Sequence, residues 1–124
     1  MVNQILLYLG AAIPLLWGVT HLFPTKSVVK GFGDISLDNQ RIITMEWIIE
    51  GVALIFIGLV VSSVTYVDYA SLISRTIYWL SFGMLNVLSV ISLLTGFKVN
   101  FLPFKLCPVL FTTSSILILL GSCL

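Results

Sequence analysis

The chain has 124 residues, of which 59% are hydrophobic and only 9% are charged, and its formal net charge is +1. A water-soluble domain carries roughly 25% charged residues. The composition therefore excludes a soluble globular protein and predicts an integral membrane protein whose first partner is the lipid bilayer. The nearly neutral charge provides no basic field, so we expect no nucleic-acid partner.

Four apolar stretches are long enough to cross a bilayer, which takes about 20 residues. We predict an all-α, polytopic integral membrane protein, a bundle of four transmembrane helices at residues 3–23, 41–64, 75–97 and 106–124. Short connections leave no length for a second unit, so residues 1–124 are expected to form a single transmembrane four-helix domain. The first stretch has no basic start and no cleavage site, and we interpret it as a retained span.

Two prolines shape the first span and its end. Pro14 removes a backbone donor and predicts a bend, and Pro24 disfavours further helix. The segment 24–40 is the only sizeable loop, and its apolar side chains favour a position at the membrane interface. Asp38, near the end of this loop, is a good N-cap candidate for the second span.

Basic side chains are distributed unevenly between the two sides of the bundle. The side with the first and third loops holds five of them, and the opposite side holds Arg75. The five are Lys26, Lys30, Arg41, Lys98 and Lys105. Under the positive-inside rule, both loops should be cytoplasmic and both termini outside, most naturally in a bacterial inner membrane.

The span 41–64 contains two acids, Glu46 and Glu50, which are four residues apart. An α-helix places positions i and i+4 on one face. A charged side chain at the bilayer centre costs about 2.5–3.5 kcal/mol on insertion scales. We therefore expect both carboxyls to face the protein interior or a water-filled pocket, and to titrate as a coupled pair.

These acids have polar neighbours at similar depths. Counted from the first-loop side at 1.5 Å per residue, His21 lies about 3 Å deep, Glu46 about 8 Å, Glu50 about 14 Å and Asn86 about 17 Å. One track in a bundle could hold all four, which are the candidate ligand-binding or proton-handling residues. Candidates for the wall of this pocket are Trp17, Thr20 and Trp47.

Each candidate also has a purely structural interpretation. His21 can be an interfacial side chain bonded to a carbonyl, and Glu46 can reach the headgroups or pair with Arg41. Asn86 can join two helices by a hydrogen bond, and the tryptophans can serve packing or the interfacial belt. Glu50 is the hardest to explain in this way, because it lies too deep to reach the headgroups easily.

Motifs for catalysis and cofactors are missing. There is no Gly-rich phosphate loop, nucleophile elbow or His-Glu-x-x-His motif, so no catalytic residue and no cofactor is assigned. His21 is the single histidine, which excludes a haem held by two, and no metal site is expected because Glu-x-x-x-Glu is common in helices. Cys107 and Cys123 lie about 24 Å apart along one helix, beyond disulfide reach, and are interpreted as structural.

The strings His21-Leu22-Phe23-Pro24 and Glu50-Gly51, in a layout of four spans, resemble the DoxX-like group of small bacterial four-helix membrane proteins. Some members of that group are linked to quinone-dependent sulfur oxidation. Buried acids in four spans are also similar to the emopamil-binding and sigma-2-receptor type of fold, where intramembrane acids line a pocket for a lipophilic amine or sterol. Neither resemblance assigns a catalytic residue.

The leading hypothesis is that the protein binds or handles a small lipophilic or cationic ligand in a pocket around the buried acids and His21. The first alternative is an accessory subunit of a membrane complex, of the respiratory or quinone-linked kind. The second is an oligomeric proton or ion transporter. These alternatives imply a membrane-complex partner or a homo-oligomer, and the sequence leaves open whether any reaction is catalysed.

Overall fold

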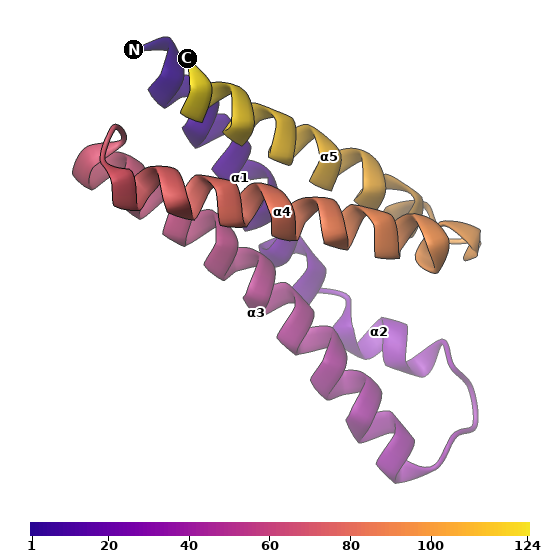
Figure 1. Ribbon diagram of the computed structural model, residues 1–124. Coiled ribbons are helices and arrows are strands. Elements are labelled where there is room, and N and C mark those ends of the chain that lie inside the picture. The colour runs from indigo at the N-terminus through magenta and orange to yellow at the C-terminus, as the bar shows by residue number, and fades with distance from the viewer.

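The computed structural model describes residues 1–124 and is all-helical, without a strand. Its four long helices run up and down with the two termini at the same end (Figure 1). They are α1 (Val2–Leu22), α3 (Leu37–Asp68), α4 (Leu72–Leu94) and α5 (Leu102–Cys123). Each is long and apolar enough to span a membrane. The predicted four-helix transmembrane bundle is thereby confirmed.

Two short helices occupy the connections at the opposite end, α2 (Thr25–Lys30) and the 3-10 helix η1 (Gly96–Lys98). The segment 24–40, predicted to be a loop, therefore contains a helix of its own. The cap of α3 also differs from the prediction. The Ser36 hydroxyl accepts a hydrogen bond from the backbone N–H of Asn39 at 3.1 Å, which leaves Asp38 in the first turn, where an acid suits the helix dipole.

Helix α3 is longer than a bilayer requires. Its 32 residues rise about 48 Å at 1.5 Å per residue, against a hydrocarbon core of about 30 Å. Its first turns project past the end of α1 and lie beside α2 (Figure 1). Hydropathy marks the apolar part of a span, whereas capping and hydrogen bonding carry the helix on into the headgroup region.

The helices pack in the order α3, α1, α5 and α4. Helix α1 contacts both α3 and α5 closely, and α4 lies along α5. Helices α3 and α4 meet near their connecting turn and then diverge (Figure 1). The Thr65 and Tyr78 hydroxyls, 2.9 Å apart, join them near that turn, and the Ser114 hydroxyl donates to the Gly10 carbonyl at 2.6 Å to join α5 to α1. Such buried polar pairs hold helices together in lipid.

Glycines allow α1 and α3 to approach each other near the end of α1. A Cβ atom on Gly18 would lie 2.6 Å from the Gly51 carbonyl oxygen, and one on Gly51 would lie 2.5 Å from the Leu22 side chain. Only hydrogen atoms fit between the helices there. This close approach brings the last turn of α1, with His21, directly against α3.

Candidate functional site

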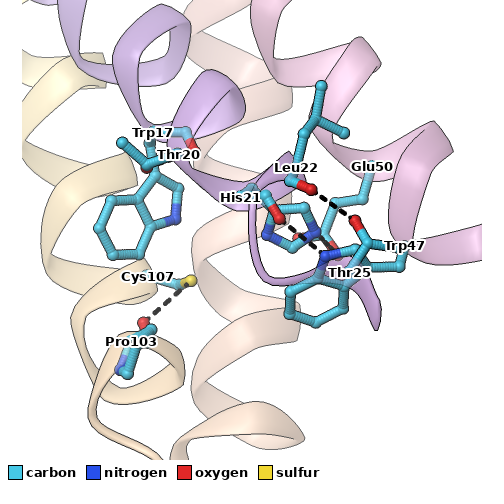
Figure 2. A network of polar contacts seen from close by, with 9 residues as sticks. All are labelled: Trp17, Thr20, His21, Leu22, Thr25, Trp47, Glu50, Pro103 and Cys107. Atoms are coloured by element: carbon cyan, nitrogen blue, oxygen red, sulfur yellow. Dashed lines mark hydrogen bonds and ion pairs between the residues drawn. The ribbon is translucent and has the colours of Figure 1, made fainter. Parts of the chain in front are cut away.

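The last turn of α1 and the first half of α3 build an aromatic and acidic cluster around His21 (Figure 2). The imidazole stacks on the ring of Trp47, with centroids 3.8 Å apart and an interplanar angle of 16°. The Nε2 atom of His21 lies 3.6 Å from Oε2 of Glu50. Only 7% of the His21 side chain is exposed, so the imidazole is enclosed by protein.

Local sequence explains how these groups come together. His21 lies in the last turn of α1, where backbone carbonyls have no partner within the helix. The Nε1–H of Trp47 donates to the His21 carbonyl oxygen at 2.7 Å and satisfies one of them (Figure 2). Trp47 and Glu50 are three residues apart on α3 and therefore face the same way. One face of α3 thus supplies both the stacking ring and the carboxylate.

A cavity of about 190 Å³ lies beside this cluster and is called the Trp17 cavity here. Its polar wall comes from Trp17, Thr20 and His21 on α1, and Trp47 closes it from α3. The apolar part of its wall is formed by Pro24, Phe101, Pro103 and Phe104, with Cys107 beside them. All three residues predicted as pocket wall, together with His21, surround this one cavity.

Two buried nitrogen atoms in the Trp17 cavity have no hydrogen-bond partner in the protein, Nε1 of Trp17 and Nε2 of His21. An indole N–H can only donate, and leaving a buried donor unsatisfied costs about 1–3 kcal/mol. The hydroxyl of Thr20, in contrast, donates to the Trp17 carbonyl at 3.0 Å. Nε2 of His21 faces Oε2 of Glu50 at 3.6 Å, whereas the indole N–H of Trp17 has only the Cys107 thiol close by, and a thiol sulfur is a weak acceptor. The indole N–H of Trp17 therefore distinguishes this cavity from ordinary packing space.

Glu50 borders a second hollow, the Glu50 groove, which opens where α3 and α4 diverge. It measures about 350 Å³ and is lined mainly by apolar residues, among them Leu54, Leu88 and Phe111. The Glu50 side chain is 49% exposed. The expectation that this carboxyl is sheltered in the interior holds only for the side that faces His21, because α3 and α4 do not close over the other side.

Two of the predicted site residues lie apart from the cluster. Glu46 is exposed, so the expectation that it faces the interior is wrong. It shares a shallow hollow of about 330 Å³ with Glu50 on α3, which confirms that the two acids share a helix face. Asn86 donates from Nδ2 to the Phe82 carbonyl at 2.8 Å within α4 and lines none of these hollows.

The predicted depths need a correction. The count placed His21 and Glu50 about 11 Å apart in depth, yet their side chains are 3.6 Å apart. This count assumes that the membrane edge on α3 lies at Arg41. Because the first turns of α3 extend past the end of α1, residues 47–50 lie level with His21.

Sequence reasoning missed the contribution of α5. Cys107, interpreted as structural filler, borders both the Trp17 cavity and the Glu50 groove. Its thiol donates to the Pro103 carbonyl at 3.3 Å (Figure 2). A depth count on the last span would have placed Cys107 near the same end as His21. No sequence signal marked Phe104, which also borders both hollows.

The polar groups of this set differ in what they can donate or accept. It offers one nitrogen that only donates, one imidazole and one carboxylate behind the imidazole. No group of three or more His, Cys, Asp or Glu side chains is placed to hold a metal ion. Fold and site together define a multi-pass, four-helix membrane protein with a cavity at one end of the bundle. Comparison with protein families, curated proteins and solved structures finds no match.

Proposed function

We propose that this protein binds a small lipophilic ligand in the Trp17 cavity. The observation that supports this most directly is the buried indole N–H of Trp17, which has no hydrogen-bond partner in the protein and lies in a largely apolar wall. Ligand sites typically combine apolar walls with a few polar groups that fix orientation. A polar group on the ligand would supply the missing hydrogen bond, and the apolar wall would hold the rest.

Native mass spectrometry of the protein extracted in a mild detergent tests this proposal. The wild-type chain should retain a small molecule, and Trp17→Phe, which removes the N–H, should retain about tenfold less of it. Trp79 is an exposed tryptophan outside the cavity, so Trp79→Phe is the matched control and should bind normally. Equal retention by the two variants would reject the Trp17 cavity as the binding site.

Glu50 acts in this proposal by positioning His21. Its carboxylate lies against Nε2 of the imidazole, so Glu50→Gln keeps the shape and removes the charge that orients the ring. We expect weaker ligand retention in Glu50→Gln. Glu46→Gln removes an equivalent charge one turn away, at a side chain without an ion pair or hydrogen bond to the cluster, and should leave retention unchanged. Unchanged binding and stability in Glu50→Gln would contradict this role.

One observation favours a second candidate function, an oligomeric proton or ion transporter. Glu46 is exposed and Glu50 is half-exposed on the same face of α3. Copies that associate through this face would line their shared axis with carboxylates. Mass measurement in lipid nanodiscs separates the two candidates, because ligand binding needs no shared axis and predicts a monomer or a small dimer. A defined oligomer whose proton flux in vesicles is lost in Glu46→Gln would favour transport.

The orientation in the membrane is part of the proposal. Residues of the α2 segment and of the segment before α5 line one common cavity, so the first and third connections lie at one end of the bundle. That end holds five of the six basic side chains, which favours a cytoplasmic position. We place this end in the cytoplasm, with both termini outside and a bacterial inner membrane as the host.

A further inference from the structure

Three hollows meet at the ring of Phe104. The Trp17 cavity and the Glu50 groove both border it, and so does a third hollow, called here the α2 cavity. The α2 cavity measures about 400 Å³ and is lined by Val28, Phe32 and Val99, among others. Pro24 and Phe101 belong to both the α2 cavity and the Trp17 cavity. The two cavities are therefore neighbours that share a wall of three apolar side chains.

Phe104 is the part of this wall that is best placed to move. It lies in the first turn of α5, and its ring is held by edge contacts with aromatic neighbours. The centroid distances are 5.8 Å to Trp47 and 5.3 Å to Phe101. The ring of a phenylalanine makes no hydrogen bond that would hold it in place, so the side chain can change to another rotamer. The ring of Pro24, by comparison, is bonded to its own backbone nitrogen and cannot rotate away.

The polar wall of the Trp17 cavity selects the chemistry of the ligand head. The unpaired indole N–H of Trp17 can only donate, so its partner must be an acceptor such as a carbonyl or ether oxygen. Glu50 does not line this cavity and lies on the Glu50 groove instead. An ammonium head has only donors, so it cannot satisfy the Trp17 N–H, and no carboxylate lines this cavity to neutralise its charge.

Cavity size indicates the shape of the ligand. The Trp17 cavity, at about 190 Å³, is below the range of about 300–1,000 Å³ that holds a whole drug-sized ligand. A cavity of this size suits the head group of a ligand and not the whole molecule. The neighbouring α2 cavity is larger. Its lining residues Phe32 and Val99 are exposed, so an apolar chain from the bilayer interface can reach it.

We infer that the ligand is a neutral, elongated lipophile whose head accepts a hydrogen bond from Trp17 and whose chain lies in the α2 cavity. Phe104 is the movable side chain that it passes on entry from the membrane interface. This inference rests on the proposed function, because it specifies the ligand and the route for the same Trp17 cavity.

Three twelve-carbon probes test the head group on the full chain in phospholipid nanodiscs: methyl decyl ketone, dodecylamine and dodecane. We expect the ketone to bind about tenfold more tightly than dodecane, because it alone supplies an acceptor. Dodecylamine should show no such advantage. Binding is followed by the rise in Tm and by quenching of tryptophan fluorescence by the ketone carbonyl. Trp17→Phe should remove the advantage of the ketone, and Trp79→Phe should keep it.

Stopped-flow fluorescence with the same ketone tests the route. Phe104→Ala should speed both entry and release about tenfold or more, because it removes the moving ring. Phe56→Ala is the control, since Phe56 is an exposed phenylalanine on α3 that borders none of the three hollows, and it should exchange at the wild-type rate. If Phe104→Ala fails to fold, Phe104→Leu, which keeps an apolar side chain of smaller width, should show a smaller acceleration in the same direction.

The outcomes distinguish a failure of the proposed function from a failure of the inferred head group or entry route. If none of the three probes binds to the wild-type protein, the proposed function itself fails. If probes bind but the amine exceeds the ketone, the acceptor-head inference is overturned while lipophile binding stands. Wild-type exchange rates in both Phe104 variants would overturn the entry route alone.

Discussion

The two buried nitrogen-bearing rings on α1 have different surroundings. His21 is stacked on Trp47, faces the Glu50 carboxylate and receives a hydrogen bond at its own carbonyl. Trp17, one turn earlier, has a buried indole N–H without a partner. The contacts of His21 stabilise the end of α1 against α3. The unpaired group of Trp17 lowers stability, and a bound acceptor would recover that loss.

Two conservative substitutions distinguish the roles of Trp47 and Trp17. Trp47→Phe loses the hydrogen bond to the His21 carbonyl and should reduce the free energy of unfolding by about 1–3 kcal/mol. Trp17→Phe removes an unsatisfied donor, and the gain should offset much of the lost packing, so we expect a change within about 1 kcal/mol. Titration with a denaturing detergent measures both in ligand-free protein. A larger loss for Trp17→Phe than for Trp47→Phe would contradict this assignment.

At the scale of the elements, the distance between α1 and α3 determines the site. Gly18 and Gly51 let the two backbones touch, and this contact sets how deeply His21 sits against Trp47 and Glu50. Helix α4 has no such contact with α3 along most of its length, so the Glu50 groove remains open. The cavity beside α1 and the groove beside α4 therefore follow from where α3 has a close helix neighbour and where it has none.

A pair of glycine substitutions tests the role of this contact. A Cβ on Gly18 would lie 2.6 Å from the Gly51 carbonyl and 2.9 Å from the Ile55 backbone nitrogen, so Gly18→Ala must push α1 from α3. We expect a loss of about 1–3 kcal/mol, as for other overpacked contacts. Gly83→Ala is the control, because nothing lies within 4 Å of its Cβ, and better helix propensity should leave it neutral or more stable by about 1 kcal/mol. Equal unfolding curves for both variants would refute the close contact.

At the scale of the whole molecule, the sequence predicted four spans because each contains a long apolar run. It did not predict their ends, since Leu37 and Asp68 lie four residues beyond the predicted limits of the second span. Nor did it predict which face of α5 meets the site. In lipid, the outer and inner faces of a helix are both apolar, so hydrophobic periodicity does not distinguish them. Phe104 and Cys107 could be placed only from the packed helices. The i, i+4 rule correctly put the two acids on one helix face, but it did not show that Glu46 is exposed.

The orientation of the bundle gives a prediction for the molecule as a whole. The turn between α3 and α4 lies at the same end as both termini (Figure 1), and the basic connections lie at the other. If the positive-inside rule decides the orientation, the exposed Cys123 should react with a membrane-impermeant maleimide in right-side-out spheroplasts. The buried Cys107 should react only after unfolding.

Two introduced cysteines, each in a Cys123→Ser background, complete the test. Asp34→Cys, between α2 and α3, should react only after lysis, because the proposed orientation puts the end with five basic side chains in the cytoplasm. Ala70→Cys, in the turn between α3 and α4, should react in intact spheroplasts. The opposite pattern would reverse the orientation. Labelling of both positions from one side would be incompatible with α3 crossing the membrane, and hence with a four-span bundle.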